Sequence, residues 1–253
     1  MGKIIIVTAQ KGGTGKSAVL SHVAHGLKRR GNSVLILDSD EAPTLKKGYD
    51  DRHNYLDLDV IPEDLANDYP LVKRLRPSDP VDKVLEVGVR KYDYVFIDTQ
   101  GKLGAFEAEL ISKSDFALMV VGASDLEFEE SYDVVKLTNS IAERYNKTIP
   151  TIGVLTRVNP KDRYLNSYIR DRVLNEAHGL ENDLSDNVII KLLEPLGFTC
   201  YDAQERTTYM TKVLQTKWGR KDVSTISKKR ASETVLETEK VIDELLEELA
   251  KYG

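Results

Sequence analysis

The sequence feature that most constrains the fold is an apolar run that leads directly into a glycine-rich segment. The apolar run covers residues 3–9, and the segment QKGGTGKS follows it at residues 10–17. Residues 17–30 then show the spacing of an amphipathic helix, which Gly31 is suited to end. A buried strand that passes through a tight glycine turn into a helix predicts an α/β fold.

The rest of the chain repeats this alternation of short apolar runs and longer helical patterns. Runs without polar alternation are typical of strands buried on both faces. We therefore expect one domain over residues 1–253, with a mostly parallel central sheet flanked by helices on both faces. Asp79 is expected to cap its helix, and residues 187–193 fit either a strand or a helix. The expected strands are 3–9, 33–38, 56–61, 94–98, 116–122 and 151–156, and the expected helices are 17–30, 79–91, 127–145, 161–177 and 232–251.

Composition excludes several kinds of protein. Of 253 residues, 41% are hydrophobic and 30% are charged, so the chain can bury a core and is not disordered. The single cysteine, Cys200, excludes disulfides within the chain and iron–sulfur centres built from several thiolates. No apolar stretch is long enough for a signal peptide or a membrane-spanning helix, so we expect a soluble, cytoplasmic protein.

The glycine-rich segment has the chemistry of a phosphate-binding loop. Its glycines let successive N–H groups converge on phosphate oxygens, and the helix behind them adds a favourable dipole. Lys16 is expected to neutralise the β- and γ-phosphates, and the Ser17 hydroxyl is expected to bind Mg²⁺. The loop after residues 151–156 is the expected adenine site. The expected nucleotide-binding residues are Lys11, Gly12, Gly13, Thr14, Gly15, Lys16, Ser17, Ala18, Gly101, Arg157 and Asn159.

Carboxylates follow two of the expected strands. Asp38 and Asp40 come at the end of the second strand, and Asp98 ends the run at residues 94–98. Ligands bind at the carboxyl ends of strands in open parallel sheets. We expect Asp98, in the Walker B arrangement, to contact the groups that bind the metal, and Asp38 to orient Mg²⁺ through its water shell. Gly101 follows Asp98 and is positioned to present its N–H to the γ-phosphate.

The run from Lys11 to Ser17 resembles the deviant Walker A motif of the ParA/MinD family of positioning ATPases. This resemblance implies a P-loop NTPase fold, with ATP and Mg²⁺ as cofactors. It implies that Lys11 crosses a dimer interface to the nucleotide of the partner subunit, and that Asp40 positions the attacking water. The protein is thus expected to be a homodimer when ATP is bound, with Lys11, Lys16 and Asp40 as catalytic residues.

Three positions depart from the family pattern. Asp40-Glu41-Ala42 stands in place of the usual Asp-Pro-Gln, and Ala18 replaces the hydroxyl that commonly follows the Mg²⁺ ligand. Thr-Gln-Gly follows Asp98 where Thr-Pro-Pro is usual. None of these changes removes a charge that the mechanism requires, so they bear on the rate of hydrolysis and not on the type of reaction.

Basic residues gather before the last expected helix, although the chain as a whole has a net charge of −5. Tyr209 and Trp218 are interleaved with them. Such a patch suits phosphate backbones of any sequence, and a solvated lysine face is the alternative. The resemblance favours DNA, because ParA-like partition ATPases bind nonspecific DNA near the C-terminus. The expected DNA-binding residues are Lys212, Lys217, Arg220, Lys221, Lys228, Lys229 and Arg230.

The last expected helix separates two kinds of relative. MinD-like proteins that bind membranes end in a basic amphipathic helix. Here the apolar stripe lies beside an acidic face, which anionic lipid would repel, so we expect the stripe to pack on the domain and expect no membrane partner. We thus expect a small, nucleoid-associated partition ATPase that moves a plasmid, chromosome region or protein cargo with a ParB-like adaptor. A MinD-like or flagellar-type regulator, or another nucleotide-dependent enzyme, stays open. The stripe consists of Ile242, Leu245, Leu246 and Leu249.

Overall fold

A fully parallel sheet forms the centre of the molecule, with strand order β3-β2-β4-β1-β5-β6-β7. The computed structural model describes residues 1–9, 13–101, 104–159, 161–219 and 226–252. β1, β4 and β5 lie at the middle of the sheet and consist almost entirely of buried residues, as their unbroken apolar runs predict. The strands are β1 (Lys3–Thr8), β2 (Val34–Asp38), β3 (Leu71–Arg74), β4 (Tyr94–Asp98), β5 (Phe116–Gly122), β6 (Thr151–Val158) and β7 (Leu184–Ser185).

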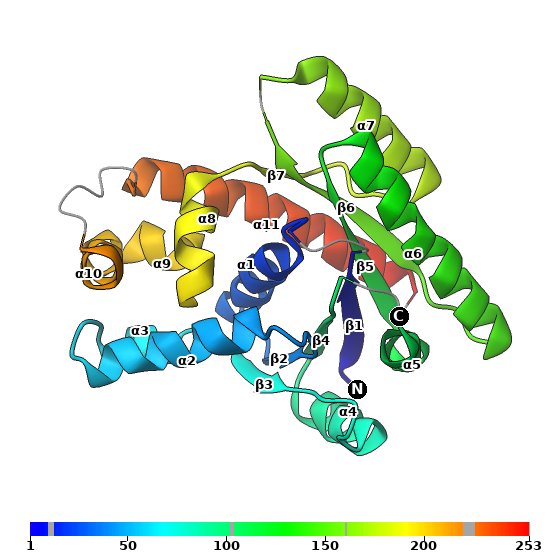
Figure 1. Ribbon diagram of the computed structural model, residues 1–253, viewed down its shortest axis with the longest axis horizontal. Helices are drawn as coiled ribbons and strands as arrows, with labels where there is room; N and C mark the ends of the chain where they lie inside the picture. Colours follow the sequence, from blue (N-terminus) through cyan, green and yellow to red (C-terminus); the bar gives the residue numbers. More distant parts are fainter. Residues whose placement is uncertain (10–12, 102–103, 160, 220–225, 253) are drawn as a thin grey trace.

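Helices cover both faces of the sheet, which confirms the expected fold class (Figure 1). α1 and α11 pack on one face, and α4, α5, α6 and α7 pack on the other. The helices are α1 (Lys16–Arg29), α2 (Thr44–Asp57), α3 (Glu63–Asn67), α4 (Val81–Lys91), α5 (Ala105–Lys113), α6 (Asp125–Arg144), α7 (Arg163–Glu176), α8 (Val188–Leu193), the 3₁₀ turn η1 (Glu194–Leu196), α9 (Cys200–Glu205), α10 (Thr207–Trp218) and α11 (Lys228–Lys251).

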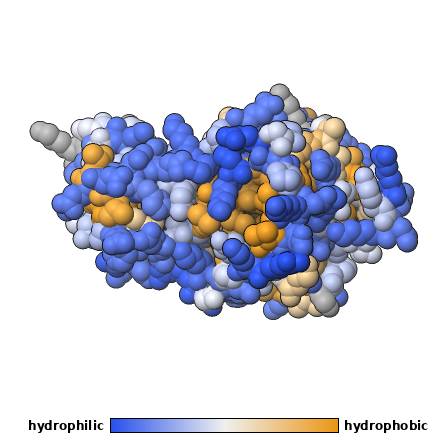
Figure 2. All heavy atoms as spheres, turned by 90° about the horizontal axis from the view of Figure 1, so that it is seen from below, coloured by the Kyte–Doolittle hydropathy of each residue, from blue (hydrophilic) through white to orange (hydrophobic). Residues whose placement is uncertain are grey.

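A second apolar cluster lies beyond the sheet, at the left end of the molecule in Figure 1. It joins α2 and α3 to α8, α9 and α10 and to the start of α11. Seen from below, the surface is mostly hydrophilic, with hydrophobic groups gathered in separate patches (Figure 2). Within the described residues, no helix is both long and apolar enough to cross a membrane.

Three local predictions need correction or completion. Residues 56–61 are not a strand, because they form the end of α2 and the turn before α3, where Leu56 packs on the second cluster. The edge strand is β3 instead. Asp79 does not cap α4: its carboxylate accepts the N–H of Arg76, and the helix begins after Pro80. Of the two options left open for residues 187–193, the structure has the helix, α8.

Candidate functional site

The phosphate loop joins β1 to α1 at the centre of the sheet. Gly13 and Gly15 have φ values of 87° and 90°, in the left-handed region that favours glycine. α1 begins at Lys16 without a side-chain cap, so its first N–H groups remain available to an anion. The chain leaves β1 for one side of the sheet and leaves β4 for the other, which is where open α/β sheets bind ligands. Lys11 and Gly12 lie outside the described residues.

Lys16, Ser17 and Asp98 come together at the end of β4. The Lys16 Nζ lies 2.7 Å from Asp98 Oδ1, and the Ser17 hydroxyl donates to Asp98 Oδ2 at 2.8 Å. The Asp98 carboxylate is fully buried and therefore needs partners. Lys16 compensates its charge, and Ser17 donates a hydrogen bond to its second oxygen. A bound nucleotide would draw Lys16 from this carboxylate toward phosphate, because both are anionic acceptors for the same ammonium group.

Asp38 is the last residue of β2 and lies opposite Asp98 in the β2–β4 pairing, and Asp40 follows two residues later. Asp38 is fully buried, and its oxygens accept the N–H groups of Asp40 and Lys46. Burial raises the pKa of the Asp38 carboxyl, and the nearby Asp98 adds to this shift. Asp40 is half-buried, and its Oδ1 accepts the N–H of Ala42 at 2.9 Å.

Arg74, at the end of β3, lies beside Asp38 and Asp40, and the sequence analysis did not predict it. Its Nη1 lies 3.2 Å from Asp38 Oδ1 and also donates to the carbonyl of Asp40. β3 contains only two apolar residues, so the sequence lacked the pattern that would have placed an arginine here. Arg74 thus ties the loop that carries Asp40 to the edge of the sheet.

The side chains at the loop fit Mg²⁺ only in combination with phosphate. Ser17 and Asp98 supply hydroxyl and carboxylate oxygens, which are the ligands that Mg²⁺ prefers. In the part of the chain that the structure describes, no group of three or more His, Cys, Asp or Glu side chains is arranged to hold a metal. Mg²⁺ typically takes one or two protein oxygens together with substrate phosphates and waters, and this site suits that mode.

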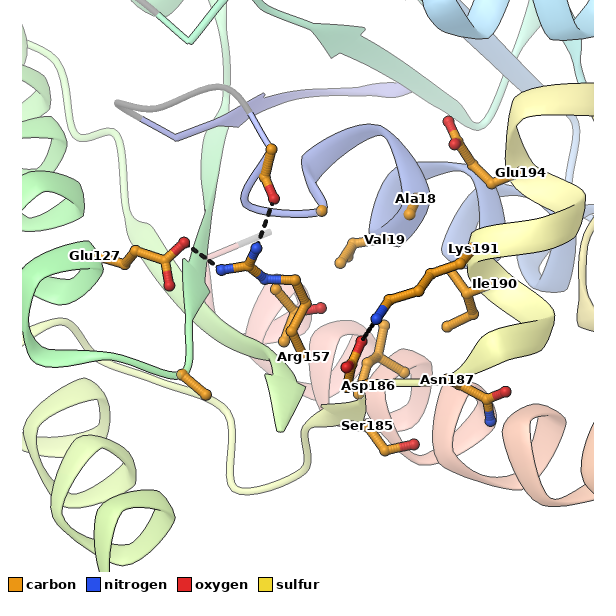
Figure 3. Close-up of a pocket in the computed structure, with 15 residues that line it drawn as sticks. Ala18, Val19, Glu127, Arg157, Ser185, Asp186, Asn187, Ile190, Lys191 and Glu194 are labelled. Atoms are coloured by element: carbon orange, nitrogen blue, oxygen red, sulfur yellow. Dashed lines mark hydrogen bonds and ion pairs between the residues drawn. The ribbon is translucent and has the colours of Figure 1, made fainter. Parts of the chain in front are cut away.

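A cavity of about 420 Å³ opens beside the phosphate loop. Gly13, Gly15 and Ala18 line it from the phosphate loop and α1, and Arg157, near the end of β6, lies beside the loop and contacts Gly13 (Figure 3). Arg157 therefore lines the cavity that adjoins the phosphate loop. Asn159 does not line this cavity: its side chain donates to Asp162 at 2.9 Å in the turn before α7.

The far wall of the cavity comes from β7, α8 and η1. The sequence analysis assigned neither β7 nor η1 and left α8 open between a strand and a helix. Asp186 and Lys191 lie on this wall and form an ion pair of 2.6 Å (Figure 3). Glu194 lines the same wall and lies near Lys16 and Asp98. Burial raises the pKa of Glu194 to about 7, and Asp98 adds to this shift while Lys16 opposes it. β7 has only two residues, which is too short for a strand pattern, so the sequence did not predict that these side chains lie at the cavity.

Those basic residues that the structure describes belong to α10 and the start of α11, which lie at the end of the molecule away from α6 and α7 (Figure 1). Lys212 and Lys217 belong to α10, and Lys217 approaches Asp51 at 4.0 Å. Lys228, Lys229 and Arg230 are exposed and form the first turn of α11. Cations there oppose the helix dipole, so they weaken this helix. Arg220 and Lys221 lie outside the described residues.

The apolar stripe of α11 packs on the domain, as expected. Ile242, Leu245 and Leu249 are buried in the core that also contains α1. The acidic face of α11 is partly engaged as well: Glu239 and Asp243 pair with Arg30 at the end of α1. α11 is therefore a structural element of the sheet domain.

Residues 5–193 match the domain family described as CobQ/CobB/MinD/ParA nucleotide binding domain. The sporulation initiation inhibitor protein Soj of Bacillus subtilis is 26% identical over 182 residues, covering 61% of this chain and 72% of Soj. A plasmid partition protein from Borrelia burgdorferi, solved with AMPPNP, has a TM-score of 0.60 at 17% identity and covers 87% of this chain and 99% of that one. MinD of Pyrococcus horikoshii with Mg-ADP has a TM-score of 0.59 at 20% identity, with coverage of 86% and 96%. These two structural similarities concern the fold alone.

Proposed function

Because the chain belongs to the CobQ/CobB/MinD/ParA nucleotide-binding domain family, we propose that it hydrolyses ATP with Mg²⁺ and uses this cycle to position a cargo. The observation that supports this most directly is the meeting of Lys16, Ser17 and Asp98 at the start of α1. These residues supply the cation, hydroxyl and carboxylate that a phosphoryl-transfer site requires.

Each residue has a defined task in this proposal. Lys16 and the N–H groups of the loop hold the phosphates, and Asp40 orients the attacking water. Ser17 and Asp98 would hold Mg²⁺, which neutralises charge that develops on the phosphates when it is bound. Asp38 and Arg74 position the Asp40 loop through their own contacts. The cavity beside Arg157 would take the base.

We propose that two subunits enclose two nucleotides, with Lys11 of each reaching the nucleotide of the other. Two phosphate groups that face each other repel, and a cation from each subunit offsets that repulsion. Lys16 is already committed to the phosphates of its own subunit. Lys11 is therefore free to act on the partner's nucleotide.

Replacing Lys11 by Ala should leave ATP binding intact but prevent stable dimerisation and hydrolysis. Sedimentation with ATP, in the slowly hydrolysing Asp40→Ala background, should show a dimer with Lys11 present and a monomer in the Lys11→Ala variant. Lys161→Ala, which removes an exposed cation from the loop after β6, is the matched control and should remain dimeric. A monomer in the Asp40→Ala background itself, at micromolar concentration, would contradict the sandwich.

We further propose that the ATP-bound dimer binds DNA of any sequence through the basic cluster and moves a plasmid, chromosome region or protein cargo with a ParB-like adaptor. One subunit offers only a few phosphate contacts, so its own affinity should be weak at physiological salt. Dimerisation brings two patches onto one rigid body and raises the affinity through multivalency.

Replacing Lys228, Lys229 and Arg230 together by Glu should weaken DNA binding about equally on all sequences. The slope of log affinity against log salt should flatten by about 0.9 per lost phosphate contact. Fluorescence anisotropy with labelled duplexes, with and without ATP, measures both effects. Acidic residues in a first helical turn favour the helix dipole, so unfolding of α11 would not explain the loss.

The matched control reverses three exposed cations of α4, namely Lys83, Arg90 and Lys91, and should bind DNA as the wild type does. ATP hydrolysis without DNA should survive in both triple variants. Tight DNA binding without nucleotide, or no effect of the α11 variant, would favour the alternative of a MinD-like or flagellar-type regulator.

A further inference from the structure

We infer that Glu127 and Arg157 act together as positioning residues that set the shape of the phosphate loop and thereby its affinity for nucleotide. The inference rests on the proposed function, because it assumes that the loop binds nucleotide phosphates. It assigns a role to Glu127, which no motif of the sequence singled out, and it gives Arg157 a task beyond lining the cavity.

Arg157 connects three segments that are far apart in the sequence. Its Nη1 donates to the carbonyl oxygen of Gly13 at 2.9 Å, and its Nη2 pairs with Glu127 Oε1 (Figure 3). Glu127 belongs to the first turn of α6, which follows β5, whereas Arg157 is near the end of β6. The end of the sheet thus contacts the phosphate loop from outside.

Glu127 is itself held in place. Its Oε2 accepts the hydroxyl of Ser124 at 2.9 Å, and the Ser124 hydroxyl in turn caps α6 by accepting the N–H of Glu127. The Glu127 side chain is only 16% exposed. Because Ser124 holds Oε2 of the Glu127 carboxylate, Oε1 has a fixed position and can orient the Arg157 guanidinium.

The contact with Gly13 controls the direction of one N–H group of the loop. A trans peptide is planar, so the Thr14 N–H points opposite to the Gly13 carbonyl. With that carbonyl bound to Arg157, the N–H is turned to the other side of the peptide. A phosphate nest needs its N–H groups to converge, and this requires that the carbonyls face outward. An outside donor to a carbonyl therefore stabilises the converged form.

Two backbone features show that the arrangement is built around these side chains. Arg157 has a φ of 58°, a conformation that a residue with a Cβ adopts only where its surroundings hold it. Gly122, at the end of β5, leaves the space that the pair occupies: a Cβ there would lie 2.6 Å from Arg157 Nη2 and closer still to Glu127 Oε2. Both are ends of flexible side chains, so an alanine would push the pair aside without unfolding the strand.

The inference is tested by titrating the purified protein with fluorescent ADP. Glu127→Gln and Gly122→Ala should each raise the Kd about five- to tenfold, because a charge-assisted contact to the loop is lost or displaced. The kcat at saturating ATP should stay within about twofold, because the phosphates themselves then hold the loop. Melting temperatures should stay close to that of the wild type.

Glu129→Gln is the matched control, since it removes the same charge from the same helix. Glu129 pairs with Arg172 of α7 and does not line the cavity. The Glu129 side chain is 56% exposed, so solvent screens this ion pair and it contributes little. We therefore expect the Glu129→Gln variant to bind fluorescent ADP with a Kd within about twofold of the wild type. The Kd of the Arg157→Lys variant should lie between those of the wild type and Arg157→Met. A lysine keeps the charge, but its single ammonium group cannot contact the Gly13 carbonyl and the Glu127 carboxylate as the forked guanidinium does.

A double-mutant cycle separates this role from direct contact with the nucleotide. If Glu127 acts through Arg157, adding Glu127→Gln to Arg157→Met should change the Kd little further. Additive losses, or a wild-type Kd in both Glu127→Gln and Gly122→Ala, would overturn the inference while leaving the proposed function intact. Absence of adenine-nucleotide binding in the wild type would overturn the proposed function and, with it, this inference.

Discussion

Replacing Lys16 by Ala should abolish productive nucleotide binding. The variant loses the ammonium group that neutralises the β- and γ-phosphates, and hydrogen bonds to charged groups contribute about 1.5–3 kcal/mol each. We expect the affinity for ATP to fall by at least about tenfold to a hundredfold, and hydrolysis to become undetectable. Calorimetric titration with ATP and a phosphate-release assay measure the two effects.

The same substitution should also destabilise the fold, which provides a control. Without Lys16, the buried Asp98 carboxylate keeps only the Ser17 hydroxyl of its two contacts. Removing one partner of a buried ion pair costs about 3–5 kcal/mol. The double variant Lys16→Ala, Asp98→Asn should recover much of the melting temperature but none of the ATP affinity. Wild-type ATP affinity in the Lys16→Ala protein would contradict the site.

Replacing Asp40 by Ala should separate binding from hydrolysis. Asp40 is half-buried beyond β2, and the contacts that hold its loop come from Arg74 and Asp38. Because the substitution removes water positioning and leaves the phosphate loop unchanged, ATP should bind with an affinity close to that of the wild type. The kcat should fall by about 10²- to 10⁴-fold. Single-turnover kinetics with labelled ATP measures the rate directly.

The neighbouring Glu41 provides the matched control for this prediction. Its carboxylate lies in the same loop and accepts the side-chain amide of Gln100 at 3.1 Å. Glu41→Ala therefore removes an equal charge from the same place and should keep a kcat within a few-fold of the wild type, about threefold at most. Turnover of Asp40→Ala at the wild-type rate would show that another group positions the water.

The sequence by itself determined the parts of this protein that depend on local patterns. Buried parallel strands are continuous apolar runs, so β1, β2, β4, β5 and β6 were predicted close to their observed bounds. The turn between β1 and α1 needs glycine at positive φ, and the sequence has glycine there. The sequence also placed the phosphate loop and Asp98 at one edge of the sheet, because parallel strands bring their carboxyl ends together. The direct contact between Lys16 and Asp98 came from the structure.

The tertiary structure decided what polar residues do inside the protein. α2 was not predicted, because its buried face includes Gly48 and Arg52 and so lacks an apolar stripe. Arg52 is fully buried and donates two hydrogen bonds to the carboxylate of Asp202 in α9. Its guanidinium carbon also lies 4.7 Å from the centre of the Phe198 ring. The spacing of apolar residues cannot predict a buried arginine, because the carboxylate that compensates its charge is distant in the sequence.

The same reason explains which site residues the sequence did not reveal. Arg74, Glu127 and Glu194 each lie beside charged residues of other elements. Charged residues on short or polar segments look like solvent-exposed residues until the chain folds. The phosphate loop could be predicted because its chemistry is contiguous in the sequence. The contacts around it form only when the ends of β2, β3 and β6 and the helix α8 are brought to the same edge of the sheet.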